Sequence, residues 1–123
     1  MPNLSTLIDE GTQIRQTFPS KALEIFRKAL EESVNNSDEE YRAISLFNIA
    51  ITYLILGNYN KSISYFQDAL GTDHAQSNTE LRSEILRGIA QNNTRKYNYK
   101  EALRYFYLSE NASIQTWNME NLH

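Results

Sequence analysis

Few side chains in this sequence are of the kinds that carry out chemistry, and their spacing does not form an active site. There is no cysteine, which excludes disulfides, thiolate metal sites and cysteine nucleophiles. The two histidines, His74 and His123, lack neighbours with metal-ligand spacing. The acidic run Asp38-Glu39-Glu40 suits a helix start, where carboxylates complement the helix dipole. We therefore expect a protein that is not an enzyme and that holds no metal or cofactor.

The side chains best suited to recognition are Asn48 and Arg87. An asparagine amide offers both a donor and an acceptor, and an arginine guanidinium can hold a carboxylate through two parallel hydrogen bonds. Each residue also has a simpler interpretation, because Asn48 can be bonded within the fold and Arg87 can lie on a solvated face. The choice depends on the elements that carry the two residues.

Composition and charge favour a folded protein whose partners are other proteins. The 123 residues are 41% hydrophobic and 22% charged, which suits one globular domain. The net charge of −3 comes from scattered residues without a basic cluster, so we expect no direct nucleic-acid binding. The start, MPNLSTLIDEG, lacks a signal-peptide layout, and the apolar stretch from Ile49 to Leu56 is too short to span a bilayer. These features predict a cytoplasmic protein that does not enter membranes.

The chain repeats itself at a spacing of 40 residues. Residues 37–70, placed on residues 77–110, match mainly at apolar or helix-capping positions. The matched pairs are Ser37 and Ser77, Glu40 and Glu80, Leu46 and Leu86, Ile49 and Ile89, Ala50 and Ala90, Asn58 and Asn98, Tyr59 and Tyr99, Ile63 and Leu103, Tyr65 and Tyr105, and Phe66 and Phe106. An internal repeat of this length is typical of stacked helical units.

Each unit is expected to consist of two antiparallel helices. The motifs Ser37-x-x-Glu40 and Ser77-x-x-Glu80 are capping boxes and predict where the first helix of a pair begins. Gly57-Asn58 and Tyr97-Asn98 predict the tight turn, because glycine and asparagine tolerate positive φ and asparagine can cap the next helix. Apolar residues then recur at three- and four-residue spacings along the second helix.

An earlier unit precedes these two. Phe26 and Ala29 lie 40 residues before Phe66 and Ala69, which predicts a second helix over residues 19–34 with Pro19 in its first turn. The first helix of this unit is expected over residues 4–17.

We therefore predict an all-α, right-handed α-solenoid of three antiparallel helix pairs plus a C-terminal helix, forming a single domain over residues 1–123. The repeats are expected at 4–36, 37–76 and 77–111. The last segment, 112–123, carries Ile114, Trp117 and Leu122. It is predicted to be either a capping helix or the opening helix of a truncated fourth repeat.

The middle unit resembles the tetratricopeptide repeat. The resemblance rests on the run Leu46-Phe47-Asn48-Ile49-Ala50-Ile51-Thr52-Tyr53, on Gly57-Asn58-Tyr59, and on Phe66 and Ala69-Leu70. Ser62 stands where the family usually has alanine, and the third unit departs from the pattern at Asn93 and Tyr97. The resemblance covers about residues 4–110. A period of 40 is similar to the longer-helix variety found in kinesin light chains and in peptide-sensing regulators of Gram-positive bacteria.

The resemblance implies that the first helix of each pair faces a concave groove that binds another polypeptide. The residues expected in this groove are Ile44, Phe47, Asn48, Ile51, Leu54 and Ile55 from the middle unit, and Glu84, Arg87, Gln91, Thr94 and Arg95 from the third. Ordinary packing against neighbouring helices is the alternative for the apolar members. The resemblance also gives Asn48 the place of a groove asparagine that bonds a peptide backbone, whereas Gly88 occupies the equivalent place in the third unit.

Part of the family binds acidic chaperone tails through a clamp of Lys, Asn and Arg residues. Here only Asn48 matches that clamp, because Ile8, Thr12, Glu84 and Gly88 occupy the other positions. We therefore do not expect this chain to bind such a tail.

Three functions remain open for the whole chain. It is either a free-standing, non-catalytic scaffold that binds a protein or peptide segment, or a sensory input module of a longer signalling protein such as a kinase, a cyclase or a transcriptional regulator. The third possibility is a homodimer, formed through the groove or through the C-terminal helix.

Overall fold

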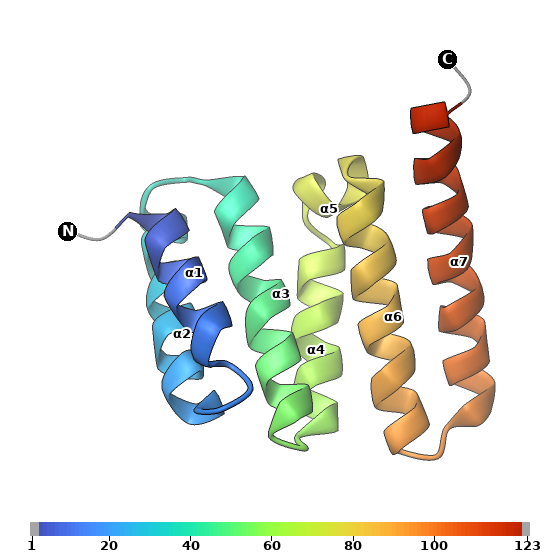
Figure 1. The fold of residues 1–123 in the computed structure, drawn as a ribbon, viewed down its shortest axis with the longest axis horizontal. Helices are drawn as coiled ribbons and strands as arrows, with labels where there is room; N and C mark the ends of the chain where they lie inside the picture. Colours follow the sequence, from blue (N-terminus) through green and yellow to red (C-terminus); the bar gives the residue numbers. More distant parts are fainter. Residues whose placement is uncertain (1–2, 122–123) are drawn as a thin grey trace.

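The computed structural model describes residues 3–121, which form seven α-helices and no strand (Figure 1). The helices are α1 Leu4–Ile14, α2 Pro19–Asn35, α3 Glu39–Ile55, α4 Tyr59–Leu70, α5 Asp73–Ser77, α6 Thr79–Arg95 and α7 Tyr99–Asn121. The long helices stand side by side as antiparallel pairs, so the predicted all-α solenoid is confirmed. Within residues 3–121, no helix is both long and apolar enough to cross a membrane.

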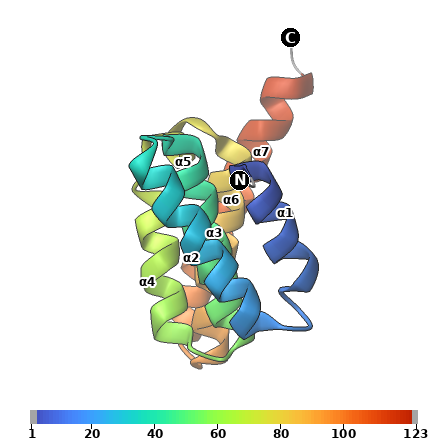
Figure 2. The same ribbon diagram turned by 90° about the vertical axis from the view of Figure 1, so that its left-hand side faces the viewer.

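The pairs are α1 with α2, α3 with α4, and α6 with α7, and they stack through contacts of α2 with α3 and of α4 with α6. In the described part of the chain, α3 also approaches α1 and α6 directly, whereas α2, α4 and α7 do not approach one another. Helices lie closer together on the inside of a curved stack than on the outside. The helices α1, α3 and α6 therefore form its inner side, and Figure 2 views the stack from its α1 end.

Three of the turns between helices have the same backbone geometry. Ser37, Gly57 and Tyr97 adopt positive φ angles of 53°, 79° and 64°. In each turn the following N–H donates to a carbonyl five residues earlier, as from Asn58 N to Tyr53 O at 2.9 Å. This pattern is the Schellman motif, which satisfies the free carbonyls of a helix end. The tight turns predicted at 57–58 and 97–98 are therefore confirmed.

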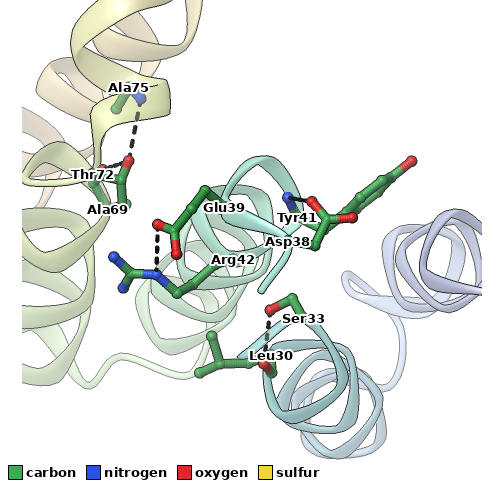
Figure 3. Close-up of polar contacts among 9 residues, drawn as sticks. All are labelled: Leu30, Ser33, Asp38, Glu39, Tyr41, Arg42, Ala69, Thr72 and Ala75. Atoms are coloured by element: carbon green, nitrogen blue, oxygen red, sulfur yellow. Dashed lines mark hydrogen bonds and ion pairs between the residues drawn. The ribbon is translucent and has the colours of Figure 1, made fainter. Parts of the chain in front are cut away.

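The predicted capping boxes are wrong by one residue. Asp38, and not Ser37, accepts a hydrogen bond from Tyr41 N at 3.0 Å and caps α3 (Figure 3). Asn78, and not Ser77, accepts from Leu81 N at 3.0 Å and caps α6. Ser37 is already in the left-handed position that ends α2, and Ser77 is the last residue of α5. The two actual caps are still 40 residues apart, so the repeat spacing holds.

The first helix is shorter than predicted. It ends at Ile14 and not at Thr17, because Pro19 follows closely and restricts the residue before it to extended backbone. Phe18 accordingly has φ −130° and ψ 68°. Pro19 itself begins α2 as predicted, at a position where its missing N–H costs no hydrogen bond.

The short helix α5 was not predicted from the sequence. Thr72 caps it by accepting a hydrogen bond from Ala75 N at 3.2 Å, and its hydroxyl donates to Ala69 O at 2.7 Å (Figure 3). Both Thr72 and Ala75 are buried. The linker between the second and third pairs is therefore a packed element of the fold.

The C-terminal segment is not a separate helix, in contrast to the prediction for residues 112–123. It continues α7 without a break as far as Asn121, and α7 extends past the end of α6 in both views (Figures 1 and 2). No glycine or proline interrupts residues 99–121, and the buried residues Ser109 and Ala112 keep one face against α6. Leu122 and His123 lie outside the described residues.

The core is built around one phenylalanine from the second helix of each of the first two pairs. Phe26 and Phe66 are 0% and 1% exposed. A Cβ atom built on Gly11 would lie 2.3 Å from the Phe26 ring, and one built on Gly88 would lie 2.3 Å from the Phe66 ring. Each ring therefore occupies space that only glycine leaves free on the facing helix.

Ser62, which departs from the family pattern, joins two repeats through buried hydrogen bonds. Its hydroxyl donates to Ala50 O at 2.6 Å and accepts from the Asn92 amide at 2.8 Å. Ser62 and Asn92 are both 0% exposed. The alanine that the family usually has could not make this connection between α3, α4 and α6.

Replacing Tyr97 with glycine is expected to raise the free energy of unfolding by about 0.5–1 kcal/mol. The left-handed conformation costs a residue with a Cβ about 1–2 kcal/mol, and the greater freedom of glycine in the unfolded chain cancels only part of that gain. Tyr97 is 77% exposed, so few contacts are lost. Gly57→Ala is the matched control and should lower the same free energy by about 1 kcal/mol. Urea denaturation measures the free energy of unfolding of both variants. If it changes in the same direction in Tyr97→Gly and Gly57→Ala, this explanation is wrong.

Gly88→Ala is expected to lower the free energy of unfolding by about 1–2 kcal/mol, because overpacking against the buried Phe66 ring outweighs the better helix propensity of alanine. Gly71→Ala is the control, since its new Cβ would meet no atom closer than 3.6 Å. A second change, Phe66→Leu, should lower the free energy of unfolding by less in the Gly88→Ala variant than in the wild type, because the smaller side chain relieves the overpacking. Additive effects in this double-mutant cycle would show that the two positions do not interact.

Candidate functional site

A groove runs between α3 and α6 on the inner side of the stack. Its first hollow has a volume of about 190 Å³. The residues lining it are Phe47, Ile51 and Leu54 from α3, Glu84, Arg87, Gly88 and Gln91 from α6, and Phe66 from α4. A second hollow of about 280 Å³ shares Leu54 and Gln91 with the first and is completed by Thr94, Arg95 and Phe106. We call the two hollows together the α3–α6 groove.

The base of the groove is the place where Phe66 of α4 meets Gly88 of α6. Direct contact between α3 and α6 is sparse, and α4 packs against both of them. The Phe66 ring meets the Phe47 ring edge to face, with centroids 5.9 Å apart and planes at 61°. Because Gly88 has no side chain, the Phe66 ring lies directly against the α6 backbone. The first hollow therefore has an aromatic floor.

The two walls of the groove differ in polarity. Phe47, Ile51 and Leu54 are half-buried on the α3 side and provide an apolar wall. The α6 side presents the exposed polar residues Arg87 and Gln91. A bound chain could therefore place apolar side chains against α3 and polar groups against α6.

The cations of the groove have no internal partner. In the described part of the chain, Arg87 and Arg95 take part in no ion pair, although Glu84 is one turn from Arg87 on α6. The ion pairs found there join Arg42 to Glu39 and Arg104 to Glu101, and both are between neighbours on one helix. The positive charge of Arg87 and Arg95 is therefore open to a carboxylate from outside, which a guanidinium can hold through two hydrogen bonds.

Asn48 is bonded within the fold. It is only 4% exposed, its Oδ1 accepts from the Arg15 guanidinium at 2.7 Å, and its Nδ2 donates to Ile44 O at 2.9 Å. Burial lowers the pKa of Arg15, because desolvation disfavours its charged form. Of the two interpretations of Asn48 that the sequence left open, the structure therefore contains the structurally bonded one.

The other expected groove residues divide into two groups. Phe47, Ile51, Leu54, Glu84, Arg87, Gln91, Thr94 and Arg95 line the hollows. Ile44 and Ile55 are half-buried on α3 and line neither hollow. Phe66 and Phe106 also line the hollows and were not expected there. Their spacing of 40 residues predicted only that they pack against neighbouring helices.

The side chains considered for chemistry remain dispersed. His74 lies on α5, half-buried, and His123 is outside the described residues. Among residues 3–121, no group of three or more His, Cys, Asp or Glu side chains is arranged to hold a metal ion. Asp38 caps α3, and Glu39 and Glu40 occupy its first turn, so the acidic run lies at a helix start as predicted.

Comparison with known proteins identifies the repeat. A family model for the tetratricopeptide repeat matches residues 14–73, which extend from the end of α1 to the start of α5. A search of curated proteins gave no match. The matched segment contains the complete α3–α4 pair, whose partner at a spacing of 40 residues is formed by α6 and the first half of α7. Residues 14–73 therefore carry tetratricopeptide repeat sequence, which supports the family assignment that the sequence resemblance predicted.

Proposed function

We propose that this protein is a non-catalytic scaffold that binds a segment of another protein in the α3–α6 groove. Tetratricopeptide repeats generally mediate interactions between proteins, and stacked helical repeats use their concave side for this purpose. The observation that carries the proposal is the groove itself, where an aromatic floor lies beside arginines that form no ion pair with any other residue of 3–121. Apolar surface beside convergent polar groups is the usual composition of a recognition site.

The groove favours a ligand segment with an apolar residue followed or preceded by an acidic one. An apolar side chain in the first hollow would contact Phe47, Ile51 and the base formed by Phe66. A carboxylate farther along would reach Arg87 or Arg95 on α6. Charge and shape thus select the same class of ligand, an apolar and acidic peptide. A strongly basic peptide would be repelled by the two arginines.

A sensory input module within a longer signalling protein is the second candidate function. It uses the same groove, because such a module also binds a peptide or a domain, and it differs in having an output domain elsewhere in the protein. The open reading frame around this segment decides between the two. A kinase, cyclase or DNA-binding domain in the same frame would establish the input module.

The groove assignment predicts that Arg87→Glu weakens binding of a selected peptide by about 10–100-fold, since hydrogen bonds to charged groups contribute about 1.5–3 kcal/mol. Peptides are first selected on the wild-type protein from a random display library, and their affinities are then measured by fluorescence anisotropy. The selected set should be enriched in peptides that combine apolar and acidic residues. Phe47→Glu should also weaken binding, because it places a charge on the apolar wall.

Lys28→Glu is the matched control for this experiment. Lys28 is exposed on α2, outside both hollows, so the variant has the same change of charge as Arg87→Glu without touching the groove. Circular dichroism confirms that each variant is still helical. If folded Arg87→Glu and Phe47→Glu proteins bind the selected peptides as tightly as Lys28→Glu does, the groove is not the binding site.

A further inference from the structure

The outward face of α7 carries large apolar side chains that the rest of the described chain does not cover. This α7 face consists of Tyr99, Leu103, Phe106, Tyr107, Ile114 and Trp117. Leu103 is 70% exposed, Tyr107 65% and Trp117 58%. Single exposed apolar residues are ordinary on a protein surface, but a continuous stripe of this size marks an interaction site.

The earlier repeats show what this face would normally contact. Leu23 and Phe26 of α2 are 8% and 0% exposed because α3 packs on them, and Phe66 of α4 is 1% exposed beneath α6. Leu103 and Phe106 hold the equivalent positions on α7, where they are 70% and 39% exposed. The α7 face is therefore a repeat interface that no further helix covers within residues 3–121.

The attachment of α7 to α6 does not use these large side chains. The contact uses Tyr105, which packs against the core on the other side of α7, together with hydroxyl residues. Ser83 Oγ lies 2.6 Å from Ser113 Oγ, and Thr79 Oγ1 lies 2.6 Å from Thr116 Oγ1. Ser109 and Ala112 are buried in the same contact. Ile114 and Trp117 thus project away from the fold along the part of α7 that lies beyond the repeat, so their apolar area is available to a partner.

We propose that the α7 face binds the α7 face of a second copy of this chain in an antiparallel, two-fold symmetric dimer. Apart from Tyr107, the residues of the α7 face lie on a line through positions 99, 103, 106, 110, 114, 117 and 121, in which Glu110 and Asn121 are polar. The intervals along this line are the same in both directions from Glu110. An interface with two-fold symmetry requires such self-complementarity. Antiparallel pairing about Glu110 places Leu103 against Trp117 of the partner copy and Phe106 against Ile114 of the partner copy.

The other end of the stack argues against an open chain of copies. A head-to-tail contact would place the α7 face on the outer side of α1, whose exposed residues are Ser5, Thr6, Asp9, Glu10 and Gln13. This surface is polar and cannot replace the apolar helix that the α7 face lacks. The α7 face of a second copy is apolar along its length and can supply such a helix.

The area of the α7 face is sufficient for a dimer of moderate affinity. Four of the six side chains are aromatic, and an aromatic side chain presents about 150–250 Å² when fully exposed. At the observed exposures, the α7 faces of two copies would bury roughly 900–1,400 Å², close to the lower limit of about 1,000–1,200 Å² for specific interfaces. The dimer is therefore expected to form in the micromolar range and not to be obligate.

Glu110 makes the register testable, because it lies on the two-fold axis. Two carboxylates facing each other weaken association, so Glu110→Gln should tighten the dimer by roughly 3–10-fold. The chain has no cysteine, so Glu110→Cys introduces a single thiol per copy. In the proposed register, the two thiols are close enough to form a disulfide under mild oxidation. Glu101→Cys on the same helix lies off the stripe and should remain uncrosslinked.

The dimer is measured by sedimentation equilibrium of the full chain. Wild type should be dimeric at high micromolar concentration, and Leu103→Asp and Trp117→Asp should each make it monomeric. Both residues are largely exposed, so neither change should unfold the monomer. Val34→Asp is the control, because Val34 is 55% exposed on α2 and its replacement should leave the dimer intact.

Three results would overturn the proposal. One is a wild-type protein that stays monomeric at all concentrations. Another is a dimer that persists in Leu103→Asp and Trp117→Asp but is lost in Phe47→Glu, which would place the neighbour's helix in the α3–α6 groove. The third is a dimer in which Glu110→Cys does not crosslink. Peptide binding is scored separately, at a protein concentration too low for the dimer to form. Under that condition Leu103→Asp should keep wild-type peptide affinity, because Leu103 lines neither hollow of the groove.

Discussion

The packing of a phenylalanine ring into the space left by a glycine on the facing helix is the constraint on which this stack depends. Phe66 fills the space between the second and third repeats, and a Cβ on Gly88 would lie 2.3 Å from its ring. The ring keeps α3 and α6 apart and becomes the floor of the groove between them. One packing choice in the core therefore creates the hollow on the surface.

The helix pairs could be predicted from the sequence because the repeat applies the same local rules twice. The spacing of 40 residues identified the apolar faces, and Gly57-Asn58 identified a turn whose positive φ angle the structure contains. The ends of elements were less predictable. Ser37 resembles a cap in sequence, but the neighbouring Asp38 caps α3 while Ser37 takes the left-handed conformation that ends α2. Two adjacent residues that can both cap a helix cannot be ranked without the geometry of the preceding turn.

The groove could be predicted only in part, for reasons that differ between residues. The face of α3 that carries Phe47, Ile51 and Leu54 follows from helical periodicity and from the family resemblance. The environment of Asn48 could not be predicted in this way. Its amide oxygen accepts a hydrogen bond from Arg15, which lies 33 positions earlier in an irregular turn after α1. A side chain whose partner lies in a non-repeating segment has no counterpart elsewhere in the chain from which its contact could be inferred.

The two ends of the described stack differ in polarity, and the apolar end shares a residue with the α3–α6 groove. The polar outer side of α1 ends the row of helices as a solvated cap, whereas α7 ends it with apolar residues. Phe106 belongs to both the α7 face and the second hollow of the α3–α6 groove. A partner that covers Phe106 on α7 therefore contacts the same ring that a peptide meets at the end of the groove. Because the two binding events share this side chain, each would change the surface that is available to the other.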